Sequence, residues 1–450
     1  MNHVKIKSTI IIFLFFLGIF TVNSYLGRVQ GELLASTSIK RLTKSYYDPH
    51  NTTRKQAIID FVAALQMKDG GFVAWLTESE GAEDLITVEL AVKALSKLNA
   101  LNAVNTDKII DFVAKSQCEN GGFVVRPRNV GKDEPKIIDI ECAAYILYVL
   151  NGYDKVDRDA MLNWVLKCYR EFDTPYGKYA VFYDDPSQES GWALDIVWGI
   201  FTLYWMGELG RVDRDALANA LLSYYEEDGT FGGGFLPYET TYWCLKALLY
   251  LGALDKFDEE KRERTINYYM SFYNADKGYF DPGMGDPLAN APSPVFVLSL
   301  LGGLDRINKI KMIDLVLSCQ SPWYGGFASS PERIYDESEV GLGSTLGALE
   351  ILEALGALDV LEENFTVMYR PVWHGEPYVP REEEENSGSK LNLTFTDILV
   401  LALSIVMFSA AYVLIRKAAK YRRKFKRSKR SRKHKYIKFD FYTLKYNLYF

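Results

Sequence analysis

A motif that recurs six times between residues 54 and 360 constrains the fold of this 450-residue chain more than any other feature. Three copies combine an apolar run, a glutamine and then Gly-Gly-Phe: Ile58–Ala63 with Gln66 and Phe72, Ile109–Ala114 with Gln117 and Phe123, and Met312–Leu317 with Gln320 and Phe327. Degenerate copies carry Tyr179, Phe235 and Tyr279, so the aromatic marker recurs at spacings of 51, 56, 56, 44 and 48 residues. A period of this length is typical of a repeat protein.

Each copy predicts two helices. The first helix of copy one places Ile58, Phe61, Val62 and Leu65 on one face, with charged residues opposite, which is typical of an outer, solvent-facing helix. The second helices, such as the run 196–201, are apolar on every side, so we expect them to form an inner, buried ring.

Most of the predicted inner helices end at a glycine that can adopt the left-handed cap conformation. These glycines and the aspartates that follow them are Gly252 with Asp255, Gly302 with Asp305, and Gly356 with Asp359. Six outer and six inner helices predict an all-α body that either stacks as an open solenoid or closes into a ring.

The glutamine and Gly-Gly-Phe pattern, followed by an inner helix with acidic residues and threonine near its start and by Leu-Gly-x-Leu-Asp, resembles the repeats of the prenyltransferase β-subunit and squalene/terpene cyclase superfamily. The resemblance covers residues 54–360 and implies a closed α/α toroid, with a cavity at the end where the inner helices begin.

The chemistry of that superfamily is not matched by this sequence. Prenyltransferases of this type hold zinc with an Asp, a Cys two residues later and a His, whereas none of the four histidines lies in the repeats and the nearest candidate, Asp139-Ile140-Glu141-Cys142, has the wrong spacing. The Asp-x-Asp-Asp acid of the cyclases and the Cys-to-Gln spacing of complement-type thioester domains are also missing. We therefore expect no metal and no cofactor, and a family member without the usual catalytic motifs.

Acidic and aromatic residues on the predicted inner helices are the candidate cavity residues. They are Asp84, Glu89, Asp139, Glu141, Asp195, Trp198, Glu239, Tyr242, Trp243 and Cys244. Acids near helix starts commonly cap free N–H groups or interact with the helix dipole, and aromatics on inner helices commonly fill the core. A pair such as Asp139 and Glu239 could alternatively act as acid and base.

Two hydrophobic segments predict the topology. Residues 1–24 contain Lys5 and Lys7 before an apolar run, Ile10–Val22, which fits a secretory signal peptide or a retained signal anchor. Residues 395–415 form an apolar segment with one charge, Asp397, which is long enough for a transmembrane helix.

Charge gives the orientation of that span. Residues 416–450 hold fifteen Lys and Arg against one acid, whereas the other 415 residues hold thirty-seven bases and fifty-seven acids. By the positive-inside rule we expect the basic tail in the cytoplasm and the acidic toroid outside a cell membrane. The tail is then a juxtamembrane run that contacts lipid, and we expect no nucleic-acid partner.

Three Asn-x-Thr sequons, at Asn51, Asn364 and Asn392, agree with an exterior location. The five cysteines lack the paired spacing of a zinc site or a disulfide framework, so we expect most of them to be buried apolar side chains.

Residues 25–53 form a lead-in to the toroid, and residues 361–394, with prolines and the run Glu382–Glu385, form an extended linker before the span.

The sequence leaves two functions open. The first is a membrane-anchored toroid that binds an apolar, isoprenoid-like or glycan ligand or a protein partner, without prenyltransferase activity. The alternative is a hydrolase or lyase that acts on cell-envelope glycan or lipid through cavity carboxylates.

Overall fold

The computed structural model describes residues 45–371, except 79–80, 176, 190, 233–235 and 284. The predicted N-terminal hydrophobic segment, the predicted span at 395–415 and the basic tail lie outside these residues. No helix in the described part of the chain has the length and apolarity needed to cross a membrane.

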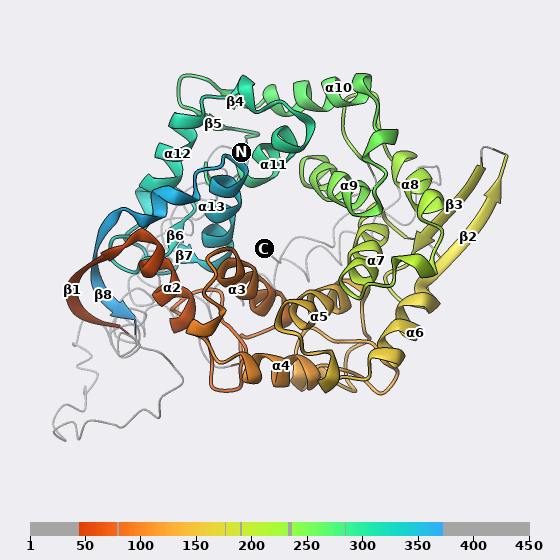
Figure 1. Cartoon of the computed structure of the whole chain (residues 1–450), viewed down its shortest axis with the longest axis horizontal. Coiled ribbons are helices and arrows are strands. Elements are labelled where there is room, and N and C mark those ends of the chain that lie inside the picture. The colour runs from red at the N-terminus through yellow and green to blue at the C-terminus, as the bar shows by residue number, and fades with distance from the viewer. Residues whose placement is uncertain are drawn as a thin grey trace, which may run out of the picture. The chain divides into compact units, whose positions relative to one another are not determined.

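The body consists of two concentric rings of helices (Figure 1). The inner helices are α3 (Leu85–Lys97), α5 (Ile137–Leu150), α7 (Ala193–Trp205), α9 (Pro237–Leu251), α11 (Pro292–Leu301) and α13 (Leu342–Ala354). The outer helices are α2 (Arg54–Ala64), α4 (Thr106–Ala114), α6 (Arg158–Cys168), α8 (Arg214–Leu222), α10 (Glu259–Met270) and α12 (Lys309–Ser318). Each inner helix packs on the next, and α13 packs on α3, so the ring is closed. The predicted α/α toroid with six helix pairs is confirmed.

Short 3-10 helices join the larger elements. They are η2 (Leu101–Ala103), η3 (Pro127–Asn129), η4 (Tyr153–Lys155), η5 (Leu209–Arg211), η6 (Leu254–Lys256), η7 (Leu304–Arg306), η8 (Pro331–Arg333) and η9 (Leu358–Glu362). Asp255, Asp305 and Asp359 lie in η6, η7 and η9. Gly252 and Gly302 cap α9 and α11 with φ of 70° and 83°, as their position at the helix ends predicted.

The glutamine of the motif forms hydrogen bonds that join its repeat to the next one. Gln66 Nε2 donates to the carbonyl of Asn105, and the Asn105 N–H donates back to Gln66 Oε1, at 3.0 and 2.9 Å. Asn105 is the N-cap of the next outer helix, α4. Gln320 makes the same kind of contact to Arg54 at the start of α2, which joins the last repeat to the first. In degenerate copies a tyrosine hydroxyl takes the place of the glutamine side-chain amide. An example is Tyr273, whose hydroxyl oxygen accepts from the N–H of Asn308.

The first glycine of Gly-Gly-Phe is required by close packing between repeats. Gly70 has a φ of 100°, and a Cβ at this position would lie 2.0 Å from the carbonyl oxygen of Lys108 in α4. Gly325, with a φ of 88°, would place a Cβ 2.4 Å from the carbonyl oxygen of Ala57 in α2. Only glycine allows both the positive φ and this approach of two backbones.

The aromatic marker is a fully buried phenylalanine, which corrects the positions predicted in the degenerate copies. Strand pairing sets Phe182 opposite Tyr169 and Phe280 opposite Tyr273, and Phe231 forms a bridge with Tyr225, as Phe72 does with Gln66. These phenylalanines, rather than Tyr179 and Tyr279, are the equivalents of Phe72, and Phe235 lies outside the described residues.

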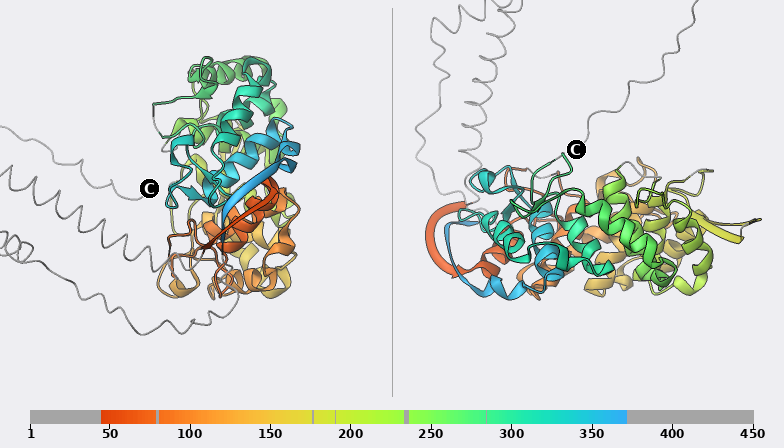
Figure 2. Two further views of the ribbon diagram at one scale, coloured as in Figure 1. Left: turned by 90° about the vertical axis from the view of Figure 1, so that its left-hand side faces the viewer. Right: turned by 90° about the horizontal axis from the view of Figure 1, so that it is seen from above.

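Four two-stranded antiparallel sheets accompany the helices, which the all-α prediction did not include. They pair β2 (Tyr169–Thr174) with β3 (Gly177–Phe182), β4 (Tyr273–Asn274) with β5 (Tyr279–Phe280), β6 (Phe327–Ala328) with β7 (Val340–Gly341), and β1 (Ser45–Thr53) with β8 (Asn364–Pro371). The β2–β3 hairpin projects outward from the ring (Figure 2). The β1–β8 sheet, called the clasp below, extends the folded body beyond the predicted toroid bounds on both sides.

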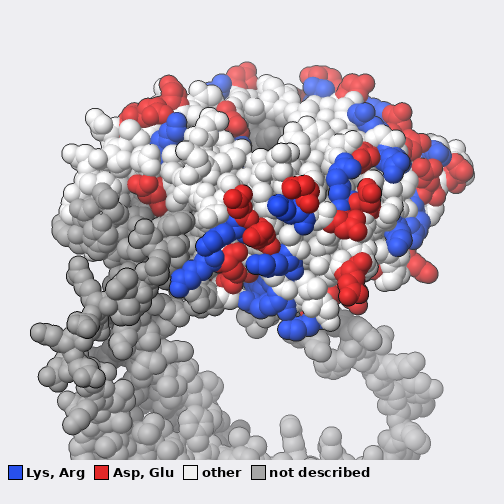
Figure 3. Space-filling view, turned by 60° about the horizontal axis from the view of Figure 1, so that its bottom comes forward, with Lys and Arg blue, Asp and Glu red and all other residues white. Residues whose placement is uncertain are grey.

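The outer surface of the ring carries mixed charge on the side that Figure 3 shows, where Lys and Arg alternate with Asp and Glu. Ion pairs such as Lys256–Asp215, at 2.7 Å, join neighbouring repeats there. All five cysteines are free, and four of them, including Cys142 and Cys244, are buried as predicted.

Candidate functional site

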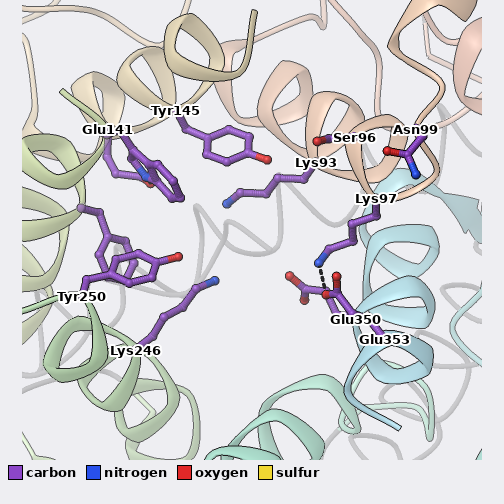
Figure 4. Close-up of a pocket in the computed structure, with 12 residues that line it drawn as sticks. Lys93, Ser96, Lys97, Asn99, Glu141, Tyr145, Lys246, Tyr250, Glu350 and Glu353 are labelled. Atoms are coloured by element: carbon purple, nitrogen blue, oxygen red, sulfur yellow. Dashed lines mark hydrogen bonds and ion pairs between the residues drawn. The ribbon is translucent and has the colours of Figure 1, made fainter. Parts of the chain in front are cut away.

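A cavity of about 450 Å3 lies in the lumen of the ring and has a predominantly charged and aromatic wall (Figure 4). Its lining residues are Lys93, Ser96, Lys97, Asn99, Glu141, Tyr145, Phe201, Trp205, Lys246, Tyr250, Glu350 and Glu353. Most of them lie in the second half of an inner helix or just after it. The sequence had placed the cavity at the end where the inner helices begin, whereas this one lies toward the end where they finish.

A regular spacing of polar and aromatic residues on otherwise apolar helices builds this wall. On α3 the series is Glu89, Lys93 and Lys97, and on α9 it is Tyr242, Lys246 and Tyr250. A step of four residues keeps side chains on one helix face, so each series forms a stripe. The inner helices direct these stripes at the lumen, where the ammonium groups of Lys93 and Lys246 point into the open centre (Figure 4).

Lys93 is the centre of a buried charge cluster. Its ammonium forms an ion pair with Glu89 one turn earlier on α3, and it lies 4.9 Å from the centre of the Tyr145 ring. Glu141 on α5 belongs to the same cluster and accepts a hydrogen bond from Trp205 Nε1 at 3.3 Å. Glu89 and Glu141 are only 6% and 3% exposed, so two acids that water scarcely reaches share one lysine, which forms its ion pair with Glu89.

The cluster favours the protonated form of Glu141. Burial, together with the neighbouring Glu89, raises the pKa of Glu141, and the opposing attraction of Lys93 does not cancel this effect. Burial would lower the pKa of Lys93, but Glu89, Glu141 and Glu350 outweigh it, so the pKa of Lys93 is well above its usual value. The physical consequence is a Lys93–Glu89 ion pair beside a carboxyl group, Glu141, that holds its proton near neutral pH.

Lys246 is held in a different way. Its Nζ lies 5.3 to 5.8 Å from the ring centres of Tyr242, Trp243 and Phe296, and donates to the Tyr242 hydroxyl at 3.2 Å. Among the described residues, no carboxylate forms an ion pair with it. Aromatic faces attract a cation without neutralising it, so Lys246 has no ion-pair partner among the described residues, although Glu141 attracts it at longer range.

Aromatic side chains form a connected series of ring contacts at and behind the cavity wall. Trp198 contacts Trp243, Phe201 contacts Tyr250, and Tyr145 contacts Trp205, each with ring centres 5.0 Å apart. The charges of Lys97 and Glu353 are paired with each other across the α3–α13 contact. The cavity thus offers both apolar ring surface and the charge of Lys246.

The acids predicted at the helix starts serve mainly as structural groups. Asp84 caps α3 by accepting from the Thr87 N–H at 2.9 Å, and Asp195 accepts from the Trp192 N–H at 2.8 Å. Burial raises the pKa of Asp195 to about 6, although the Trp192 N–H opposes the rise. Glu239 accepts from Ser293 Oγ at 2.7 Å, and burial raises its pKa. None of these acids lines the cavity.

Asp139 differs from the other acids at the helix starts because nothing in the described part of the chain donates a hydrogen bond to its carboxyl group. Burial and the neighbouring Asp184 raise the pKa of Asp139 to about 7, while Lys136 opposes the rise. Lys136 is itself 2.6 Å from Asp184. Asp139 and Glu239 were considered above as a possible acid–base pair of the cavity. Neither residue lines this cavity.

Of the ten candidate cavity residues, only Glu141 lines this cavity. Glu89, Trp198, Tyr242 and Trp243 lie directly behind its wall, in contact with lining residues. Cys244 is fully buried on α9, and burial raises the pKa of its thiol, which suits a core residue. The spacing of four residues from Glu89 to Lys97 and from Tyr242 to Tyr250 was the signal that could have located the missed lysines.

The zinc set that the family resemblance implies does not fit these residues. The groups closest to a metal site are Glu89, Glu141 and Cys142, whose ligand atoms lie within 4.8 Å of one another. The ammonium of Lys93 already neutralises this group, and burial together with the two acids raises the pKa of Cys142, which disfavours a thiolate. Without an imidazole, the group differs from the Asp, Cys and His set in both charge and ligand type.

Comparison with known proteins identifies the family. Residues 33–190 and 236–369 match the prenyltransferase alpha-alpha toroid domain. The β subunit of geranylgeranyl transferase type-2 from Saccharomyces cerevisiae is 24% identical over 292 residues, which cover 63% of this chain and 86% of that protein. The β subunit of geranylgeranyl transferase type-1 from Arabidopsis thaliana is 24% identical over 256 residues, 57% of this chain and 55% of that protein.

Solved structures with the same fold are more distant in sequence. Candida albicans protein geranylgeranyltransferase-I, complexed with GGPP, has a TM-score of 0.49 and 15% identity, covering 62% of this chain and 85% of that one. The type II terpene cyclase MstE from Scytonema has a TM-score of 0.45 and 12% identity, covering 68% and 98%. The family match spans more than half of the chain and coincides with the two-ring body described above, so the chain belongs to the prenyltransferase alpha-alpha toroid family.

Proposed function

We propose that the lumen of this toroid binds a small amphiphile that has an anionic head group and an apolar tail. The observation that carries the proposal is Lys246, a cation at the cavity wall that aromatic rings hold and that forms no ion pair with a carboxylate of the described residues. A buried or half-buried cation without an anion is costly, and a ligand anion would offset that cost. The volume of about 450 Å3 is in the range of small-molecule sites.

An isoprenoid is our choice for the apolar tail. The two curated relatives are named as geranylgeranyl transferase subunits, and the aromatic series around Phe201, Trp205 and Tyr250 offers surface for such a chain. A phosphate head would then lie at Lys246. Because the repeats lack the histidine and the Asp-x-Cys spacing of the transferases, we propose binding without prenyl transfer.

The test compares three ligands on the purified full chain: geranylgeranyl monophosphate, uncharged geranylgeraniol and inorganic phosphate. Native mass spectrometry reports occupancy. We expect the monophosphate to bind at least about tenfold more tightly than the alcohol, since a charge-assisted hydrogen bond contributes about 1.5–3 kcal/mol. Lys246→Met removes this preference, whereas Lys309→Met, on the exposed surface of α12, leaves it unchanged. Equal binding of the monophosphate by the wild type and Lys246→Met would refute the proposal.

A hydrolase or lyase is the second candidate, because Glu89 and Glu141 lie close together and burial raises the pKa of Glu141. Acid–base catalysis on a glycan or lipid uses one ionised and one protonated carboxyl group. Glu141 lines the cavity, whereas Glu89 lies behind it. Under this function Glu141→Gln abolishes turnover of cell-envelope glycan or lipid but keeps ligand binding, whereas under the first function the wild type releases no product.

We also propose that the toroid is anchored outside a cell membrane. The hydrophobic segments at 10–22 and 395–415 and the basic tail support this topology. Ser45 and Pro371 pair in the clasp, so the described chain enters and leaves the toroid at one place. Protease added to intact cells or spheroplasts should digest the toroid and spare a tag at Phe450; a tag digested together with the toroid would contradict this orientation.

A further inference from the structure

The clasp holds both Asn-x-Thr sequons of the described residues. Asn51-Thr52-Thr53 lies at the end of β1, and Asn364-Phe365-Thr366 lies at the start of β8. The paired residues that are nearest in sequence, Thr53 and Asn364, are 311 residues apart, yet the two strands form one antiparallel sheet. Two acceptor sequences from opposite ends of the toroid therefore meet on the same short element.

The register places both acceptors on one face of the sheet. Asn51 is paired with Thr366, and Thr53 with Asn364. Directly opposed residues of antiparallel strands point to the same side, and so do residues two apart on one strand. Asn51, Asn364 and Thr366 are exposed, whereas Val367, on the other face, is buried. The face that carries the acceptors is thus the solvent-facing one.

A hydrogen bond between the two sequons orients one acceptor. Thr366 Oγ1 donates to Asn51 Oδ1 at 2.8 Å. Because the carbonyl oxygen of the Asn51 amide is held by the neighbouring strand, its Nδ2 remains available on the exposed face. Thr53, the third residue of the first sequon, caps α2 by accepting from the Gln56 N–H at 3.1 Å. A substituent on Nδ2 breaks neither contact.

We propose that Asn51 and Asn364 are a pair of N-glycosylation sites on the outer face of the clasp. The co-substrate is an oligosaccharide linked to a polyprenyl phosphate or diphosphate, supplied with a separate oligosaccharyl transferase. The amide nitrogen forms a bond to the anomeric carbon of the first sugar, the bond between that carbon and the phosphate oxygen breaks, the polyprenyl phosphate or, from the diphosphate-linked donor, the polyprenyl diphosphate leaves, and the amide nitrogen loses one proton.

Glycans at these positions would also protect the clasp. A two-stranded sheet on the outside of a ring has an exposed strand edge, which can pair with a strand of another molecule. Bulky, soluble substituents on both strands block such pairing and keep this face free of protein partners. The proposal requires the toroid to be outside the membrane but does not depend on any ligand in the lumen.

The experiment is translation of the full chain with microsomes that contain oligosaccharyl transferase. All versions carry Asn392→Gln, so that steps in gel mobility come from the clasp alone. We expect two steps that peptide-N-glycosidase removes, one step after Asn51→Gln or Asn364→Gln, and none in the double variant. The matched control, Asn163→Gln, changes an exposed asparagine of α6 outside any sequon and keeps two steps.

Two further measurements make the result decisive. Peptide mass spectrometry should find Asn51 and Asn364 converted to Asp by the glycosidase, and the glycosylated chain should unfold in one cooperative transition like the enzymatically deglycosylated one. Unmodified peptides in the membrane-inserted protein, a single modified site, or unfolding caused by the glycans would each overturn the proposal.

Discussion

Acidic residues at the starts of the inner helices and those one turn further along are held in different ways. At the helix starts, Asp84 and Asp195 bind backbone N–H groups that have no partner inside the helix. One turn further along, Glu89 and Glu141 find no free N–H, because every amide there is already bonded within the helix. They are partnered by side chains instead, Lys93 and Trp205. Asp84 and Asp195 at the starts are therefore bonded to the backbone, whereas Glu89 and Glu141 depend on side chains at the lumen.

The largest expected effect is that of Lys93→Met. Loss of the ammonium leaves Glu89 and Glu141 buried without a cation, and breaking a buried ion pair costs about 3–5 kcal/mol. Chemical denaturation of the full chain, followed by tryptophan fluorescence, measures the free energy of unfolding. The double variant Lys93→Met with Glu89→Gln should recover a large part of the loss. A single variant that unfolds like the wild type would show that the cluster is not the buried, paired centre described here.

Asp139→Asn should stabilise the fold by an amount that grows as pH rises from about 4 to about 7. The pKa of Asp139 is about 7 in the folded state and near 3.9 when unfolded, so between these values the folded chain holds a proton that the unfolded chain has lost. Stability contributed by this group is therefore present at low pH and falls as pH rises from about 4 to about 7.

The expected gain from this substitution at pH 8 is about 2 kcal/mol. The shift alone corresponds to about 4 kcal/mol at about 1.36 kcal/mol per unit, and attraction to the N-terminus of α5 reduces it. At pH 4 the gain should vanish. Asp107→Asn, at an exposed position in the first turn of α4, is the control and should show no gain at pH 8. A pH-independent effect of Asp139→Asn would contradict the assigned pKa.

Asp84→Ala tests the other role of acids at helix starts. It removes the cap of α3 and the 3.4 Å contact to Arg126, and the expected loss is about 1 kcal/mol. Asp84→Asn keeps a side-chain oxygen for the Thr87 N–H and should lose less than half as much. If both variants lost several kcal/mol, Asp84 would have a partner in the core beyond the cap.

The sequence predicted the rings because periodicity and burial are local properties. Phe61 and Ile58 already mark the inner face of α2, and Gln66 with Gly70 and Phe72 marks the junction between repeats. It could not predict which of Tyr179 and Phe182 is the buried marker, since strand register decides that. The spacing of Lys93 and Lys246 shows only that they share a helix face with Glu89 and Tyr242. Which groups a neighbouring helix brings next to them, such as Glu141 and Phe296, depends on the fold.

Lys246→Met should have the smallest effect on stability and the largest on ligand binding. Its ammonium is only half-buried and has aromatic rings rather than an acid as partners, and cation–π contacts at such sites contribute about 0.5–1 kcal/mol. A methionine keeps most of the packing, so we expect the free energy of unfolding to fall by less than about 1 kcal/mol. The two lysines therefore separate stability from binding: Lys93 is already neutralised by Glu89, whereas Lys246 is not. If both methionine variants destabilised the toroid equally, Lys246 would have an unseen anionic partner in the protein, and its charge would not be available to a ligand.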